Sequence, residues 1–99
     1  MSYSLKPSKV FLSQIKDLPS NDKLLIAEKI KLAQLNPFRN KSLKVSGLTK
    51  VFEIKVTINQ LYSRIVYTIH GNEIRIECII NRKNDFKDLL KLLQKARQE

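Results

Sequence analysis

Residues 50–83 read KVFEIKVTINQLYSRIVYTIHGNEIRIECIINRK, and this stretch decides the fold. It contains three runs in which apolar and polar side chains alternate, which is the pattern of β-strands that bury one face. Asn59-Gln60 and Gly71-Asn72 separate the runs, and these residue types favour tight hairpin turns. The stretch therefore predicts three consecutive strands in an antiparallel meander.

The first hairpin predicts a pair of like charges. If the tip lies between Ile58 and Leu61, Lys55 falls directly opposite Arg64. Two cations in these positions destabilise a sheet unless an anion lies between them. We interpret the pair as a phosphate site, and the alternative is an ordinary solvated sheet face.

The second hairpin extends the register to the third run. The predicted pairs are His70 with Glu73, Ile65 with Cys78, Arg64 with Ile79 and Tyr62 with Asn81. The apolar residues then share one face, which consists of Phe52, Ile54, Val56, Ile65, Tyr67, Ile69, Ile74, Ile76, Cys78 and Ile80. The opposite face carries Glu53, Lys55, Tyr62 and Arg64. A shift by one residue would put charge into the core, so the pattern itself predicts the register.

The rest of the chain predicts a scaffold. Residues 3–6 are expected to form a short strand, and Ser8 is expected to cap a helix that reaches about residue 18. Ser20 or Asn21 would cap a second helix ending at residue 35, and residues 38–49 read as an exposed basic loop. Asn84 would cap a last helix with the apolar row Phe86, Leu89, Leu90, Leu93 and Ala96. This order implies a single α+β domain, residues 1–99, with helices on one face of the sheet.

Charge and composition narrow the class of partner. The chain has 19 Lys and Arg residues against 9 Asp and Glu, a net charge of +10, which attracts polyanions or an acidic protein. No apolar run is long enough for a signal peptide or a membrane span, so we expect a cytoplasmic protein. No His, Cys, Asp or Glu cluster has metal-ligand spacing, and we expect no metal and no small-molecule cofactor.

Five short segments together carry a resemblance to a known family. They are LNPF at 35–38, LKVSGL at 43–48, VFEIKV at 51–56, YSRIVY at 62–67 and NRK at 81–83. In this combination the chain resembles the RelE/ParE toxins of type II toxin–antitoxin pairs, and more closely the RelE branch. The resemblance implies a small toxin that is held inactive by an antitoxin encoded beside it. Toxins of the RelE branch cut mRNA in the ribosomal A site, whereas those of the ParE branch poison DNA gyrase.

The resemblance also implies roles for individual residues. Cleavage of RNA without a metal uses the ribose 2′-hydroxyl as nucleophile, and it needs a proton acceptor, cations for the phosphorane charge and a proton donor for the leaving 5′-oxygen. Lys55 would stabilise phosphate charge, and Arg64 would clamp the scissile phosphate. Arg82 would act as acid or as a further phosphate ligand.

Two positions depart from the RelE pattern. Glu53 stands where the family prototype has a lysine, and it could act as the base or neutralise Lys55. Phe86 stands where many members have a tyrosine, so it can stack on a base but cannot transfer a proton, and Tyr62 could replace that tyrosine. The basic residues expected to contact substrate are Lys44, Lys50 and Lys83.

The sequence thus favours a ribosome-dependent mRNA endoribonuclease whose partners are a cognate antitoxin, the ribosomal A site and mRNA, with no membrane. A ParE-like inhibitor of gyrase without nuclease activity is the first alternative. A toxin remnant that only co-represses its operon with the antitoxin is the second.

Overall fold

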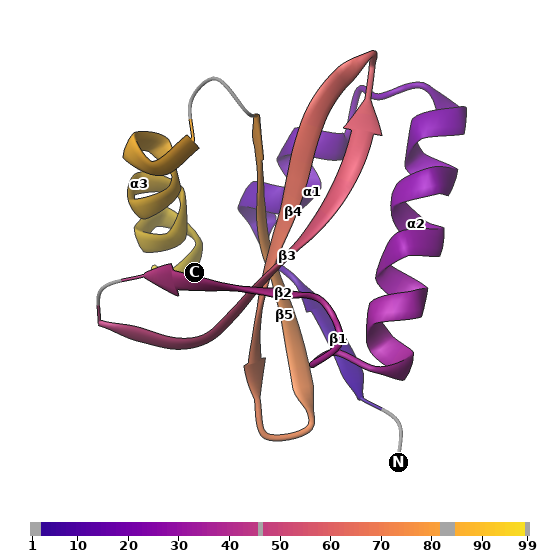
Figure 1. Ribbon diagram of the computed structural model, residues 1–99. Coiled ribbons are helices and arrows are strands. Elements are labelled where there is room, and N and C mark those ends of the chain that lie inside the picture. The colour runs from indigo at the N-terminus through magenta and orange to yellow at the C-terminus, as the bar shows by residue number, and fades with distance from the viewer. Residues whose placement is uncertain (1–2, 46, 82–84, 99) are drawn as a thin grey trace.

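The computed structural model describes residues 3–45, 47–81 and 85–98, with the backbone alone for 85–88. The elements are β1 (Ser4–Pro7), α1 (Lys9–Ile15), α2 (Ser20–Leu35), β2 (Lys41–Val45), β3 (Leu48–Ile58), β4 (Leu61–His70), β5 (Glu73–Asn81) and α3 (Asp85–Arg97), as Figure 1 shows. This is the predicted α+β class, with a short first strand, two helices, a strand meander and a C-terminal helix.

The sheet has five strands in the order β1-β5-β4-β3-β2. Strands β3, β4 and β5 form the predicted antiparallel meander, whereas β1 pairs with β5 in parallel and makes the sheet mixed. The first hairpin has the predicted register, with Ile58 opposite Leu61 and Lys55 opposite Arg64. Asn59 and Gln60 at its tip both have positive φ angles, as the commonest two-residue hairpin turn requires.

The loop predicted for residues 38–49 is wrong. Residues Lys41–Val45 form strand β2, which pairs with β3 so that Lys41 lies opposite Glu53 and Val45 opposite Leu48. Gly47, with a φ of 79°, lies between the two strands. The segment shows only a weak alternation, because polar side chains dominate it and only its last residue is buried. Its strand conformation depends on pairing with β3 rather than on an apolar face.

Strand β5 contains a β-bulge that the sequence pattern did not predict. Tyr67 pairs with Ile76 and Val66 pairs with Cys78, which leaves Glu77 as an extra residue on β5. An extra residue shifts every later pair by one position. His70 opposite Glu73 is confirmed, because this pair lies between the bulge and the hairpin tip.

The predicted pairs on the far side of the bulge are wrong for that reason. The observed pairs are Ile65 with Ile79, Arg64 with Ile80 and Ser63 with Asn81. The bulge also changes which face each side chain occupies. Cys78 and Ile80 pack in the cluster beneath α3, while Ile79 packs against the cluster that α1 and α2 cover.

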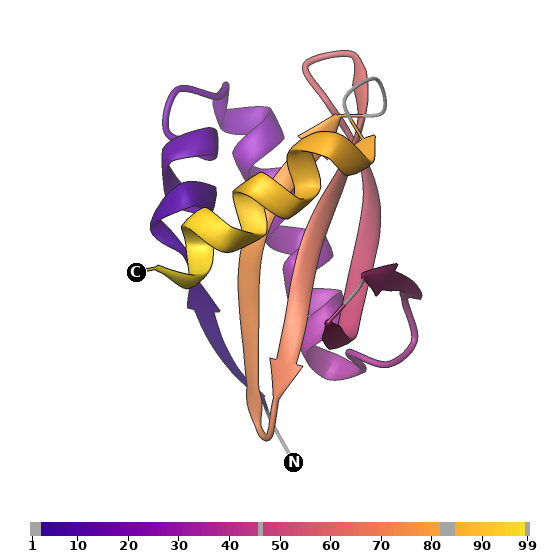
Figure 2. The same ribbon diagram turned by 90° about the vertical axis from the view of Figure 1, so that its left-hand side faces the viewer.

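Both faces of the sheet carry helices, and the prediction of helices on one face is wrong. One cluster joins Phe11 of α1 and Ile26 and Ile30 of α2 to the sheet. A second cluster packs Leu89 and Leu93 of α3 against the opposite face, which α3 crosses in Figure 2. The predicted apolar row of α3 is confirmed at Leu89, Leu93 and Ala96, whereas Leu90 is 47% exposed. The side chain of Phe86 lies outside the described residues.

Helix α1 begins as predicted and also protects an edge of the sheet. The Ser8 hydroxyl accepts a hydrogen bond from the Phe11 amide at 3.0 Å, which is an N-cap, and donates one to the Glu77 carbonyl. Beyond the end of β1, the Gln14 side chain pairs with both the carbonyl and the amide of Ile79. These contacts satisfy backbone groups of β5 where β1 no longer does.

The ends of α1 and α2 differ from the prediction. Helix α1 ends at Ile15 rather than near residue 18. The proposed cap of α3, Asn84, lies outside the described residues. Helix α2 begins at Ser20 after Pro19, without a side-chain cap from Ser20 or Asn21. No helix in the described part of the chain has the length and apolar character needed to cross a membrane.

Candidate functional site

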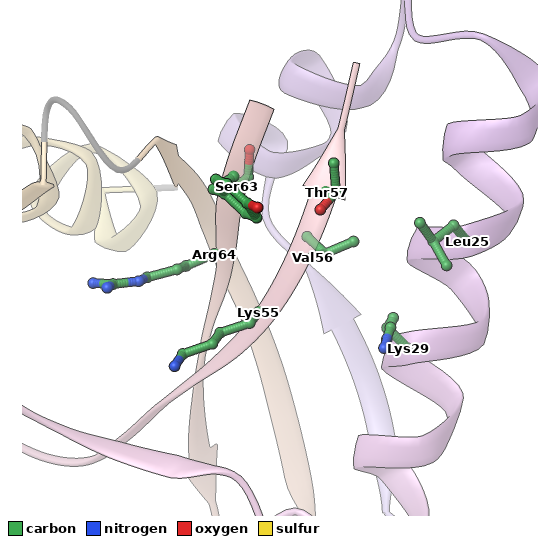
Figure 3. A pocket seen from close by; sticks show the side chains of 8 residues that line it. Leu25, Lys29, Lys55, Val56, Thr57, Ser63 and Arg64 are labelled. Carbon is green, nitrogen blue, oxygen red and sulfur yellow. The ribbon is translucent and has the colours of Figure 1, made fainter. Parts of the chain in front are cut away.

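Two cations meet on the face of the sheet that α3 only partly covers. Lys55 of β3 and Arg64 of β4 are direct cross-strand partners, so their side chains leave the sheet on the same side. Figure 3 shows both extending away from α2. Lys55 is exposed, and the Arg64 side chain is 23% exposed. The like-charge pair predicted from the sequence is therefore present and accessible.

Glu53 lies next to this pair but is fully buried. The Glu53 carboxylate is 3.2 Å from Arg64 Nε and 3.9 Å from Lys41 Nζ. Neither of its oxygens has a hydrogen-bond partner within the described residues. An ionised carboxylate without water contact is stable only beside cations, and Arg64 and Lys41 are those cations here. Glu53 is therefore placed to hold Arg64 in position.

This geometry bears on both roles considered for Glu53. A base must reach the 2′-hydroxyl that it deprotonates, and the Glu53 side chain has no exposed surface with which to do so. The expected neutralisation of Lys55 is not observed either, because Lys55 forms no ion pair with any described residue. The one Glu53 carboxylate is shared by Lys41 and Arg64, and Lys55 adds a further positive charge opposite Arg64, so the excess positive charge favours a bound anion.

Two tyrosines differ sharply in accessibility. Tyr62 lies two residues before Arg64 on the same face of β4, opposite Thr57 of β3, and it is 70% exposed. Its phenol can therefore exchange a proton with a substrate or stack on a base. Tyr67 is buried in the core, donates a hydrogen bond to the Pro37 carbonyl and accepts one from Asn40. Burial raises the pKa of Tyr67, which leaves this phenol protonated.

A groove of about 580 Å³ begins at the cation pair. Lys55, Arg64 and Tyr62 line one part of it, and Leu25 and Lys29 of α2 line the other. Strand β2 pairs with β3 only as far as Glu53, so β3 has no further strand on this side from residue 54 onward within the described chain. The groove passes around this free edge.

The remaining predicted site residues are separate from the pair or lie outside the described residues. Lys44 and Lys50 are exposed on the β2–β3 hairpin, and Lys50 is five residues from Lys55, a distance of about 17 Å along a strand. Arg82 and Lys83 lie outside the described residues, as does the side chain of Phe86. The structure thus brings together Glu53, Lys55, Arg64 and Tyr62.

Sequence reasoning missed two residues at this site. The sequence predicts a loop at Lys41, and only the pairing of β2 with β3 places it opposite Glu53. Lys29 precedes Lys55 by 26 residues in the sequence, and no local pattern connects the two. Among the described residues, no group of three or more His, Cys, Asp or Glu side chains is placed to hold a metal ion.

Comparison with solved structures identifies the fold. The chain is similar to a free-state structure of a double-arginine mutant of the E. coli toxin RelE, with a TM-score of 0.71 and 17% identity over 99% of this chain and 97% of that one. It is also similar to the isolated E. coli RelE toxin, with a TM-score of 0.65 and 18% identity over 91% and 97% of the two chains. No protein-family model and no curated protein matches. The chain has the RelE-like toxin fold.

Proposed function

We propose that this chain, which has the fold of RelE toxins, is the toxin of a type II toxin–antitoxin pair and cleaves mRNA on the ribosome. The observation that supports this most strongly is the accessible Lys55–Arg64 pair, which lies on an open sheet face next to an exposed tyrosine. Arg64 also neutralises the buried Glu53, but Lys55 has no such structural partner among the described residues, and a phosphate between the two cations would remove their repulsion.

The proposed reaction joins the ribose 2′-oxygen to the adjacent phosphorus and breaks the bond from phosphorus to the 5′-oxygen. Negative charge grows on the phosphorane oxygens, and Lys55 and Arg64 stabilise that charge. The 2′-hydroxyl loses a proton and the leaving 5′-oxygen gains one, and Tyr62 is the proposed proton-transfer group among the described residues. The described residues offer few acid–base groups at this site, so the ribosome would align the 2′-oxygen with the leaving group and supply much of the rate by orientation.

The positive charge of the chain also indicates which partners it would bind. A net charge of +10 suits rRNA and mRNA, and it suits an acidic antitoxin segment that covers the cations. We propose that such an antitoxin blocks access to the Lys55–Arg64 pair and that the toxin acts in the cytoplasm.

Induction without antitoxin tests the proposal. Translation should stop, and new mRNA 5′-ends should map inside reading frames. Lys55→Ala should lower cleavage by about two to three orders of magnitude, as loss of one charge-stabilising group does in other enzymes. Lys31→Ala provides the control, because Lys31 is exposed on α2 and does not line the groove. Intact mRNA together with gyrase-linked DNA breaks would instead establish the ParE-like alternative, and full cleavage by Lys55→Ala would exclude the proposed site.

A further inference from the structure

The groove that starts at Lys55 and Arg64 continues to the other side of β3. Figure 3 shows Leu25 and Lys29 on α2, across β3 from Lys55 and Arg64. All four residues line one groove, because the edge of β3 beyond Glu53 is not covered by β2. A chain molecule bound at the cation pair can therefore pass over the edge toward α2.

Lys29 is the residue that makes this second part of the groove attractive to an anion. It is half-buried and forms no ion pair with any described residue. Its ammonium group therefore has no carboxylate to neutralise it among the described residues, and a bound anion would supply the missing opposite charge. Every charged residue that lines the groove is a cation, namely Lys29, Lys55 and Arg64. The nearby Asp22 does not line it and accepts a hydrogen bond from the Asn59 amide.

The apolar part of the lining suits a nucleobase. Leu25 and Val56 provide aliphatic surface, and Tyr62 provides an exposed aromatic ring beside the cations. Bases of single-stranded RNA stack on exposed aromatic rings regardless of sequence, while lysines follow the backbone. An added peptide strand would lie along the edge of β3, whereas this groove crosses the edge, so its shape favours a nucleic acid strand.

We propose that this groove binds single-stranded RNA next to the scissile phosphate, with a neighbouring backbone phosphate at Lys29 and a base against Tyr62. The inference rests on the proposed function, because the Lys55–Arg64 pair is taken as the scissile-phosphate site. It adds a second contact on α2 that sets the direction in which the strand leaves the site.

Binding of a short 2′-O-methyl RNA tests this, because such a strand lacks the attacking hydroxyl and stays intact. Fluorescence anisotropy would be measured over a range of salt concentrations for the full chain, for Lys29→Gln and for the control Lys31→Gln. We expect Lys29→Gln to weaken binding several-fold. The plot of the logarithm of the association constant against the logarithm of salt concentration should fall less steeply, by about 0.7, which is the contribution of one phosphate contact on a single strand. Lys31→Gln should change neither, because Lys31 lies on the same helix outside the groove. Tyr62→Phe should bind as the unaltered chain does, and Tyr62→Ala should bind more weakly.

Equal effects of Lys29→Gln and Lys31→Gln would overturn the inference, and so would an unaltered chain that does not bind the RNA. If an acidic peptide binds the chain but not Lys29→Gln, while RNA binding is unaffected, the groove is a protein site and the inference is wrong. The proposed function is judged separately by mRNA cleavage with Lys55→Ala. A normal salt slope in Lys29→Gln together with lost cleavage in Lys55→Ala would refute only the inference.

Discussion

At the scale of single residues, Arg64 has two tasks that the sequence does not separate. It faces the open side of the sheet with Lys55, and its Nε atom lies 3.2 Å from the buried Glu53 carboxylate. The first task was predictable from alternation and the hairpin turn. The second was not, because nothing in the sequence indicates that an outward-facing glutamate is covered.

The two tasks can be separated by a double variant. Arg64→Ala should lower the free energy of unfolding by about 3 kcal/mol, because it leaves the buried Glu53 carboxylate with Lys41 alone at 3.9 Å. Adding Glu53→Gln should restore much of this stability, since no buried charge then remains, but should not restore mRNA cleavage. Urea unfolding and cleavage of the same three proteins provide the two measurements. Unchanged stability in Arg64→Ala would mean that this pair does not hold the Glu53 charge.

At the scale of elements, the sequence predicted where alternation is regular and failed where it is broken. The β3–β4 hairpin was predictable because both strands alternate and the turn residues are distinctive. The register predicted for β5 fails after Ile76, because apolar residues follow Glu77 without interruption and give no sign of an extra residue. Glu77 is itself fully buried, where Thr68 donates a hydrogen bond to it at 2.9 Å and Arg97 lies 3.9 Å away.

The bulge also directs the Cys78 side chain into the apolar layer between the sheet and α3. Burial, and to a lesser extent the negative charge of Glu77, raises the pKa of the Cys78 thiol to about 12. An unfolded thiol ionises from about pH 9, so between pH 9 and 12 the unfolded state binds fewer protons than the folded state. The free energy of unfolding should therefore fall with rising pH in that window, by at most about 1.4 kcal/mol per pH unit from this group.

Cys78→Ala removes this contribution, and urea unfolding at a series of pH values would measure it. The difference in stability between the two proteins should be constant below pH 8 and should shift in favour of the variant above pH 9. Tyr67, whose pKa is also raised, contributes equally to both proteins and cancels. Parallel pH dependence in the two proteins would show that α3 does not keep the Cys78 thiol desolvated.

At the scale of the whole molecule, the charge balance has consequences of its own. The chain carries 19 Lys and Arg residues against 9 Asp and Glu, and two of those carboxylates, Glu53 and Glu77, are buried beside cations. Most cations therefore repel one another in the folded state, which is more compact than the unfolded one. The same net charge of +10 attracts polyanions at long range.

The last prediction concerns salt and stability. Raising NaCl from about 0.01 M to about 0.15 M shortens the Debye length from about 30 Å to about 8 Å, so the repulsion weakens and the free energy of unfolding should rise. If the proposed groove binds RNA, a short single-stranded RNA at the same ionic strength should raise the free energy of unfolding further, because a ligand of the folded state stabilises it by mass action. Added NaCl should then reduce the RNA effect while increasing the stability of the free protein. A free protein that loses stability as salt is added would show that its ion pairs outweigh the repulsion, contrary to the charge balance described above.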